Sequence, residues 1–403
     1  MISLAHVQDA SRKLEGKILR TPIIRSPTIS KMADADVYLK LENLQMGGSF
    51  KVRGASYKIQ SHLSELRGKG VIAASVGNHA QGVALAARAA GLPATIIMPV
   101  WSSLAKQEAT RGYGASVVLQ GASLTESIEI AQRMADSSGQ TFIHPYDDLE
   151  VMAGQGTIGI EIIQDLPDID YVIVPVGGGG LIGGIATAVK ALRPQAKVIG
   201  VQAAACPSAR EALLAGGPVQ LEETEGSLAD AIMVSRIGDS NFPLLRDLVD
   251  RIAEVSEDQI ASAMLLMLER KRILAEGAAA VPLAALLGSQ LQLPKGSKVV
   301  LLISGGNVDS LLLDRVIRRG LVNSGRLMGL SLCIEDVPGS LRRLLAVIAD
   351  RRANVVRIHH SREEKDLPLG QARVDLELET RGFEHVKEIV DALKGSGYRM
   401  KIR

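Results

Sequence analysis

Short runs of apolar residues alternate with longer segments of helical periodicity from about residue 37 to residue 310. The runs are rich in Val, Ile, Leu and Ala and are bounded by Gly or Pro, which is typical of strands buried on both faces. Apolar residues spaced three and four positions apart between the runs predict amphipathic helices. This alternation indicates an α/β fold in which parallel sheets carry helices on both faces. The predicted strands are Val37–Glu42, Gly70–Ala74, Ala94–Met98, Ala115–Leu119, Tyr171–Val176, Lys197–Val201 and Lys298–Ile303, and the clearest helices are His79–Ala90, Ser123–Asp136 and Val151–Leu166.

The pattern changes near residue 320. The segment 318–326 is rich in Gly and charged residues, and we interpret residues 321–326 as a linker. Residues 327–403 follow the order β-α-β-β-α-β of a ferredoxin-like domain. We therefore expect a first domain over residues 1–320 and a second over 327–403. The first would have a small subdomain at about 40–150 and a large subdomain formed by 1–39 and 151–320. The second would hold strands Leu327–Glu335, Val355–Arg362, Ala372–Glu379 and Tyr398–Ile402 and helices Ser340–Arg352 and Phe383–Lys394.

Composition narrows the classes of function. The chain has 403 residues, 46% of them apolar but only 3% aromatic, so its core must be aliphatic. A net charge of +2 without a basic block gives no support to nucleic-acid binding. The two cysteines, Cys206 and Cys333, are far apart and form no metal pair and no disulfide framework. With no signal peptide and no uninterrupted apolar run of membrane-spanning length, we expect a cytoplasmic protein without a membrane partner.

The segment Gly47-Gly48-Ser49-Phe50-Lys51-Val52-Arg53-Gly54-Ala55 holds the first chemical candidate, Lys51. It lies between a predicted strand and a helical pattern, so its ammonium would face the positive end of a helix. That placement and burial both favour the neutral amine, which can form a Schiff base. A solvated helix-surface lysine is the plainer interpretation of Lys51 alone.

A second candidate follows the predicted strand Tyr171–Val176, where Gly177, Gly178, Gly179 and Gly180 precede Leu181. Backbone amides can converge there on a phosphate at the start of a helix. Gly178, Gly180 and Gly183 also fit a dinucleotide-binding pattern, but that pattern needs an acidic residue where Gln202 ends the next strand. Close helix–strand packing without a ligand is the structural alternative, although four glycines exceed what packing requires.

Two further motifs lie at predicted strand ends. Ser304, in the sequence Ser304-Gly305-Gly306-Asn307, could hydrogen-bond a ring nitrogen, or the segment could be an ordinary turn. Ser75-Val76-Gly77-Asn78-His79 precedes a helix whose free amides can receive a carboxylate, or Ser75 or Asn78 could simply cap it. A phosphate site, an amine for a carbonyl and a ring-nitrogen partner together indicate pyridoxal phosphate.

On these four motifs, residues 1 to about 325 resemble the threonine/serine dehydratase branch of the fold-type II pyridoxal-phosphate enzymes. The resemblance implies that Lys51 holds the cofactor and is the catalytic base. It implies that Phe50 packs on the ring, that Asn78 bonds its hydroxyl and that Ser304 meets its nitrogen. It assigns the phosphate to the segment from Gly177 to Leu181. The substrate carboxylate would bind the loop that holds Ser75, Gly77, Asn78 and His79.

The tail from about residue 327 resembles an ACT domain, a module that senses amino acids. The resemblance rests on Asp336-Val337-Pro338-Gly339-Ser340-Leu341 and on Asn354 at the start of a predicted strand. It implies an effector site near Pro338, Gly339 and Asn354, with isoleucine as the natural effector. Such domains usually pair across subunits, so we expect a homodimer or homotetramer.

Two differences from the serine racemase branch bear on the expected reaction. The serine racemase branch has a second acid/base serine where this chain has Val76, so one-sided chemistry is favoured over racemisation. That branch also has acidic metal ligands after the strand that here ends in Gln202, and residues 202–208 contain no carboxylate, so no metal site is expected. His359 and His360 are neighbours on a predicted strand and make a poor metal pair.

The expected reaction is α,β-elimination from L-threonine to 2-oxobutanoate and ammonia, with L-serine as an expected second substrate by resemblance. Glu276 would lie near the cofactor by the same resemblance, or serve only as a helix-end carboxylate. The alternatives are a dehydratase of serine or 3-hydroxyaspartate, a serine racemase-like enzyme, a non-catalytic amino-acid sensor and a nicotinamide-dependent dehydrogenase.

Overall fold

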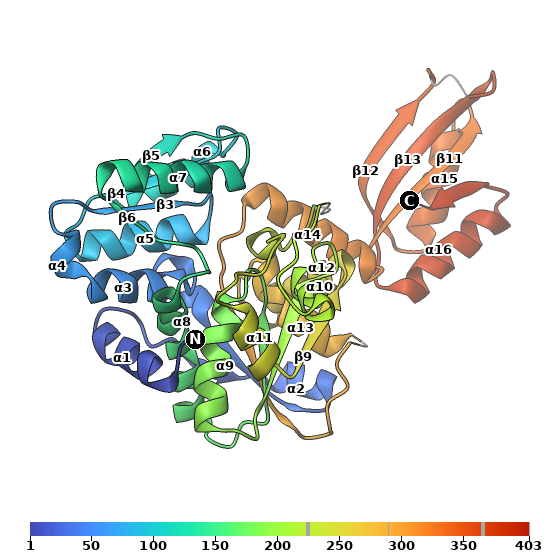
Figure 1. Cartoon of the computed structure of the whole chain (residues 1–403). Helices are drawn as coiled ribbons and strands as arrows, with labels where there is room; N and C mark the ends of the chain where they lie inside the picture. The colour runs from blue at the N-terminus through green and yellow to red at the C-terminus, as the bar shows by residue number, and fades with distance from the viewer. Residues whose placement is uncertain (223–225, 289, 364–366, 403) are drawn as a thin grey trace. The chain divides into compact units, whose positions relative to one another are not determined.

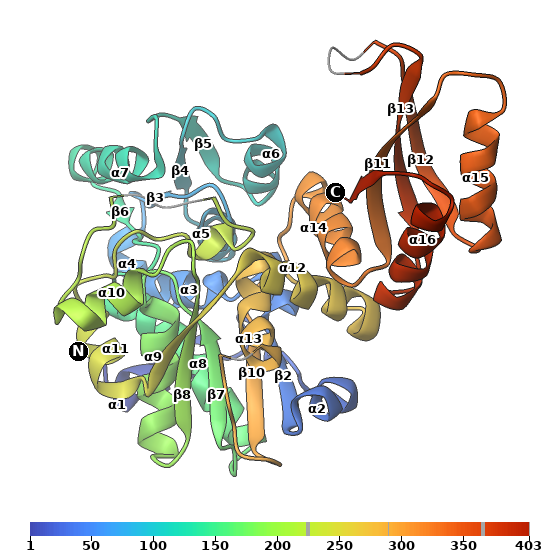
Figure 2. The ribbon, with the colours of Figure 1, turned by 90° about the vertical axis from the view of Figure 1, so that its right-hand side faces the viewer.

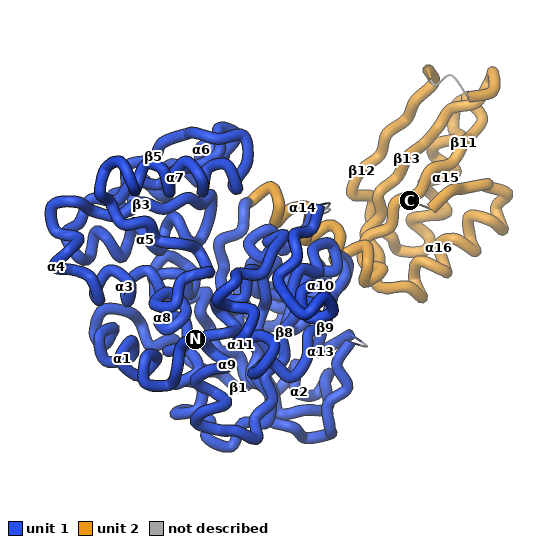
Figure 3. Tube along the Cα trace, viewed as in Figure 1, with its two compact units in different colours: residues 1–309 blue, residues 310–403 orange. Residues whose placement is uncertain are grey.

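The computed structural model describes residues 1–222, 226–288, 290–363 and 367–402. The chain divides into two compact units, Met1–Asp309 and Ser310–Arg403 (Figure 3). Unit 1 holds two sheets and unit 2 holds one, and helices cover the sheets (Figures 1 and 2).

The larger sheet of unit 1 has six strands in the order β1-β2-β10-β7-β8-β9. All neighbours run parallel except the edge strand β1, which pairs antiparallel with β2. The carboxyl ends of the five parallel strands therefore meet at one edge of the sheet. The strands are β1 (Ile23–Arg25), β2 (Asp36–Leu41), β7 (Tyr171–Pro175), β8 (Lys197–Ala203), β9 (Arg251–Val255) and β10 (Lys298–Ile303).

Both faces of this sheet are buried. Val172, Val174 and Val300 pack in one core with apolar residues of α8 to α11. Because side chains alternate along a strand, Ile173 and Leu301 point to the opposite face, and α13 contacts that part of the sheet. The six-stranded sheet therefore lies between two layers of helices, as the sequence predicts. Its helices are α1 (Leu4–Leu14), α2 (Pro27–Ala33), α8 (Leu149–Asp165), α9 (Gly180–Leu192), α10 (Ser208–Ala215), α11 (Phe242–Leu248), α12 (Glu257–Leu266) and α13 (Gly277–Leu287).

The smaller sheet of unit 1 has four parallel strands in the order β5-β4-β3-β6. One of its helices, α7, begins at a capping residue, Ser123, whose side chain accepts a hydrogen bond from the Glu126 amide 3.1 Å away. The elements are β3 (Val71–Ala74), β4 (Ala94–Met98), β5 (Ser116–Leu119), β6 (Thr141–Phe142), α3 (Lys51–Ser61), α4 (Leu63–Leu66), α5 (Asn78–Ala89), α6 (Leu104–Gly112) and α7 (Leu124–Ser138).

Unit 2 has an antiparallel sheet in the order β12-β13-β11-β14, which is the ferredoxin-like topology that the sequence predicts. Alternate residues of β11 and β13 form a core with α15 and α16. On the opposite face, Arg318 of α14 donates to Glu377 of β13 at 2.9 Å. The elements are α14 (Ser310–Asn323), β11 (Leu327–Glu335), α15 (Ser340–Asp350), β12 (Asn354–Ser361), β13 (Gln371–Glu379), α16 (Phe383–Gly395) and β14 (Met400–Ile402).

The structure differs from the expected domain boundaries in two places. Residues 321–323, expected in a linker, form the last residues of α14, and the units divide at Asp309 rather than at residue 320. The helix forms because Val316 and Gly320, one turn apart, are buried on a shared face. The expected subdomain boundary at residue 40 cuts β2, which belongs wholly to the large sheet.

Among the described residues, no helix is both long and apolar enough to cross a membrane.

Candidate active site

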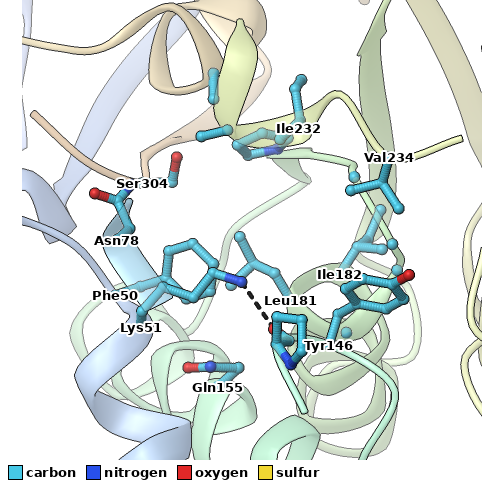
Figure 4. A pocket seen from close by; sticks show the side chains of 18 of the residues that line it. Phe50, Lys51, Asn78, Tyr146, Gln155, Leu181, Ile182, Ile232, Val234 and Ser304 are labelled. Carbon is cyan, nitrogen blue, oxygen red and sulfur yellow. Dashed lines mark hydrogen bonds between the residues drawn. The ribbon is translucent and has the colours of Figure 1, made fainter. Parts of the chain in front are cut away.

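The four chemical motifs lie at the carboxyl ends of parallel strands, where ligands of open α/β sheets bind. Segments after β2, β3, β7 and β10 all contribute to one pocket (Figure 4). In Figure 4, Ser304 and Asn78 lie on one side of this pocket, and Tyr146, Ile182 and Val234 lie on the other. All nine residues expected to bind the cofactor line it: Phe50, Lys51, Asn78, Gly177, Gly178, Gly179, Gly180, Leu181 and Ser304.

Lys51 is the first residue of α3, and its amine points into the pocket. Nζ donates a hydrogen bond to the Pro145 carbonyl at 2.8 Å (Figure 4). Burial lowers the pKa of Lys51 to about 8, although the Glu276 carboxyl nearby favours the ammonium. A substantial share of this amine is therefore neutral near pH 8, as nucleophilic attack on a carbonyl requires.

A buried ionic cluster fixes the helix that carries Lys51. Arg53, two residues further on, is completely buried and donates to Glu42 at 2.7 Å and to Glu161 at 2.6 Å. Lys40 pairs with the same Glu161. Two cations and two carboxylates thus balance inside the protein and tie α3 to β2 and α8.

The glycine segment joins β7 to the start of α9. The first amides of a helix lack intrahelical partners and point outward, so this 13-residue helix offers N–H donors to an anion. A Cβ at Gly178 would lie 2.2 Å from the Tyr146 ring, and one at Gly180 would lie 2.5 Å from the Tyr146 carbonyl. Gly179 has φ of 98° and packs against Asn241. The close approach of these neighbours requires glycine.

Ser304 follows β10, the strand next to β2, and its segment pairs with the segment before Lys51. The Phe50 amide donates to the Ser304 carbonyl at 3.1 Å, and the Gly306 amide donates to the Gly48 carbonyl at 2.9 Å. Ser49 and Gly305 form the bridge between these bonds. The pairing places the Ser304 side chain in the same pocket as Lys51.

Asn78 and Glu276 meet in this pocket. Asn78 Nδ2 donates to both carboxyl oxygens of Glu276, at 2.8 and 3.0 Å. Burial raises the pKa of Glu276 to about 7, although the hydrogen bond from Asn78 opposes the rise. Glu276 is therefore a buried group that can exchange a proton near neutral pH, and it precedes α13 without making a side-chain cap bond.

A second cavity opens beside the first and shares Lys51, Asn78 and Glu276 with it. Ser75, Gly77 and His79, the other residues expected to bind substrate, line it. Burial and the nearby Lys51 amine lower the pKa of His79 to about 3, so its imidazole is neutral, and Nε2 lies 2.9 Å from the Ile143 carbonyl. The cavity thus presents a helix start, with Ser75 and the neutral His79, next to Lys51, and Lys106, Asp230 and Asp309 also line it.

Gln202 stands where the dinucleotide-binding alternative needs an acidic residue. Gln202 accepts hydrogen bonds from the Ala209 and Arg210 amides at 3.1 and 3.2 Å, so it caps α10. No cluster of three or more His, Cys, Asp or Glu residues suited to a metal occurs among the described residues, which include His359 and His360.

The three expected effector residues do not come together within unit 2. Gly339 precedes α15 and follows the Glu335 end of β11, as Pro338 does. Asn354 pairs with Glu379, which pairs with Leu327 at the other end of β11. Pro338 and Gly339 therefore lie at one end of the sheet and Asn354 at the other.

Sequence reasoning missed several lining residues. Tyr146, Gln155, Ile232 and Val234 line the pocket but lie in no recognisable motif. Tyr146 follows the edge strand β6, and only its contact with Gly178 reveals its place. Asn307 belongs to a noted motif, but the motif alone assigns no role to its side chain.

Comparison with known proteins shows to which family the chain belongs. The family described as "Pyridoxal-phosphate dependent enzyme" matches residues 14–305, and "ACT domain" matches residues 330–395. The chain belongs to the pyridoxal-phosphate-dependent enzymes and carries an ACT domain after the catalytic fold.

Similar proteins indicate which branch of this enzyme family the chain resembles. The L-threonine ammonia-lyases of Thermotoga maritima and Geobacter sulfurreducens are 47% and 46% identical to it, each over 100% of both chains. The structure of the processed form of threonine deaminase isoform 2 from Solanum lycopersicum is 35% identical, with a TM-score of 0.74 over 78% of this chain and 93% of that one. Maize serine racemase is 32% identical, with a TM-score of 0.74 over 80% of this chain and 98% of that one.

The residues present fit the cofactor of the family. A buried amine with a lowered pKa matches its aldehyde, and the glycine segment at a helix start matches its phosphate. A serine hydroxyl can meet a ring nitrogen in either protonation state. The donors in the pocket thus correspond to each polar group of pyridoxal phosphate.

Proposed function

We propose that this protein is an L-threonine ammonia-lyase, which converts L-threonine to 2-oxobutanoate and ammonia by α,β-elimination. The observation that carries the proposal is the presence of Lys51, the glycine segment and Ser304 in one pocket. The relatives named L-threonine ammonia-lyase, similar over the full length, supply the substrate.

Bound pyridoxal phosphate supplies a carbonyl carbon for imine formation and a conjugated ring that accepts the electron pair of a broken C–H bond. Lys51 would hold this group through Nζ, the amides of Gly177–Leu181 would bind the phosphate, and Ser304 Oγ would meet the ring nitrogen. Phe50 packs beside the ring. Asn78 would meet the ring hydroxyl; its Oδ1 accepts from Asn307 at 2.8 Å, and its Nδ2 donates to Glu276 at 2.8 Å.

The substrate lies in the second cavity. Its carboxylate would bind at the start of α5, where Asn78 presents a backbone amide and Ser75 a hydroxyl, which accepts from the Gly77 amide at 3.2 Å. Lys51 Nζ, in its neutral form, would be the base that removes the α-proton of the substrate. Val76, which lines the same cavity, has no proton to return to the other face, so elimination is favoured over racemisation.

L-Serine is the second candidate substrate, because it differs from threonine by one methyl group and a hydrophobic contact of that size discriminates weakly. Similarity to maize serine racemase favours a related reaction on serine, and Val76 argues against racemisation itself.

We further infer that residues 1–309 carry out catalysis and that unit 2 regulates it. Isoleucine is the proposed effector, because 2-oxobutanoate leads to it. A homodimer or homotetramer would give the two-state behaviour that such regulation needs. A cytoplasmic location stays a prediction of the sequence.

Product analysis tests the proposal. The holoenzyme is incubated separately with L-threonine, L-serine and 3-hydroxyaspartate, and the 2-oxo acid and the chirality of the remaining substrate are measured. Release of 2-oxobutanoate and ammonia in equal amounts supports it. Turnover of serine or 3-hydroxyaspartate alone, or racemisation without a 2-oxo acid, would assign the site to an alternative.

A further inference from the structure

The side chain of Asn307 joins the segments that carry the two halves of the active site. Its Nδ2 lies 2.8 Å from the Gly47 carbonyl, in the turn that leads to Lys51. The same atom lies 2.8 Å from Asn78 Oδ1 and 3.3 Å from Gln81 Oε1, at the start of α5. Three oxygens around one nitrogen fix the orientation of this amide, because the other orientation would set oxygen against oxygen.

The hydrogen bonds continue inward from Asn307 in one direction. Asn307 donates to Asn78 Oδ1, and Asn78 Nδ2 donates to Glu276 at 2.8 Å. Asn78 is buried and lines both cavities, whereas Asn307 is exposed and lines only the second. The Asn78 amide is thus held between Asn307, which donates to its Oδ1, and Glu276, which accepts from its Nδ2.

The packing around Asn307 leaves it little freedom. A Cβ at Gly48, which has φ of 73°, would lie 2.6 Å from Asn307 Oδ1. The backbone just before Asn307 is also fixed, because the Gly306 amide donates to the Gly48 carbonyl at 2.9 Å. A residue other than glycine at position 48 would displace the amide.

We propose that Asn307 is a positioning residue that fixes the lysine turn (residues 47–50) and the substrate loop (residues 75–81) relative to each other. It acts on substrate through Asn78 and touches no reacting atom. This inference rests on the proposed function for the identity of the substrate, but not for the geometry that Asn307 imposes.

The test compares three variants of the full-length holoenzyme. Asn307→Ala removes the donors, and Asn307→Asp keeps the shape but sets a carboxylate against the oxygens of Gly47 and Asn78. Asn43→Ala is the matched control, because Asn43 Nδ2 donates at 3.2 Å to the Leu274 carbonyl and to neither segment. An exposed side chain is replaced in each Asn307 variant, so the global fold should persist.

Two measurements are made on each variant. The first is hydrogen–deuterium exchange of peptides that cover residues 46–52 and 75–82, which does not depend on turnover. The second is kcat and KM for L-threonine. We expect faster exchange in both peptides and a KM raised about three- to tenfold in Asn307→Ala, with more in Asn307→Asp and kcat changed less, because one or two hydrogen bonds are lost. Asn43→Ala should match the unmodified protein in both.

The exchange data separate this inference from the proposed function. If L-threonine is not a substrate at all, the proposed function fails, and exchange alone decides the role of Asn307. Exchange in both peptides unchanged from Asn43→Ala would overturn the inference, as would a KM within about twofold of that control in an enzyme that does turn over threonine.

Discussion

Lys51 has an amine whose protonation the protein sets by burial. With the pKa of Lys51 lowered to about 8, the neutral fraction rises with pH and is nearly complete above about pH 9. We predict that the rate at which the apoenzyme binds pyridoxal phosphate rises about tenfold per pH unit below about pH 8 and then levels off, because the neutral amine is the nucleophile. Stopped-flow absorbance measures this rate. A rate still rising steeply at about pH 10 would show an amine with an ordinary pKa.

Arg53 contributes to stability through charge balance rather than chemistry. Replacing it with Leu leaves Lys40 as the remaining cation of the buried cluster, opposite both Glu42 and Glu161. Because uncompensated buried charge is costly, we expect the free energy of unfolding to fall by about 3–5 kcal/mol.

Urea denaturation measures the effect of Arg53→Leu. Arg12→Leu is the control, since Arg12 pairs with Asp9 while 70% exposed, and such surface pairs contribute about 1 kcal/mol or less. Equal midpoints for the two variants would mean that the buried cluster adds nothing.

The segment that leads into α9 depends on the absence of a Cβ atom at its glycines. In Gly178→Ala, the new Cβ would lie 2.2 Å from the Tyr146 ring, so either the ring or the segment must move. We expect the affinity for pyridoxal phosphate to fall at least about tenfold, because the amides that bind the phosphate would lose their alignment.

Titration of the apoenzyme with the cofactor measures this affinity. Gly183→Ala on the same helix is the control, since its Cβ would meet the flexible end of Leu244 at 3.2 Å. The prediction fails if both variants bind the cofactor equally well.

The elements best predicted from sequence are those that bury continuous apolar runs. The predicted bounds of β4, β10 and β11 agree with the structure. The edge strands β1 and β9 escaped prediction, because β1 has three residues and β9 exposes Arg251. Residues 321–323, at the end of α14, were expected in a linker because the charged and glycine residues at 318–320 obscure an apolar face that packs beside β11.

The residues of the site also differ in how well they could be predicted from the sequence. Lys51, the glycine segment and Ser304 could be predicted, because each needs a particular residue type at a strand end. Tyr146 and the amide of Asn307 could not be predicted, because their roles arise from contacts between segments far apart in the chain.

At the scale of the whole molecule, the connection between the units begins close to the active site. Asn307 lies three residues before Ser310, the first residue of unit 2. A change of state in unit 2 therefore has a short covalent route to the segment that pairs with the lysine turn. We predict that L-isoleucine lowers the rate with L-threonine, by binding one state of an oligomer more tightly than the other.

Titration of the rate against isoleucine, valine and serine measures this regulation. An ACT domain that serves only to join subunits would leave the rate flat for all three amino acids.

The central claim is that one pocket binds pyridoxal phosphate at Lys51 and eliminates the hydroxyl of L-threonine. The most direct measurement is the visible spectrum of the purified protein before and after L-threonine is added, with 2-oxo acid assayed in the same cuvette and Lys51→Ala as control. The account predicts a yellow absorption band that shifts as 2-oxobutanoate accumulates, and neither in the control. A colourless protein that stays inert after pyridoxal phosphate is added, or a Lys51→Ala variant that keeps both band and turnover, would contradict it.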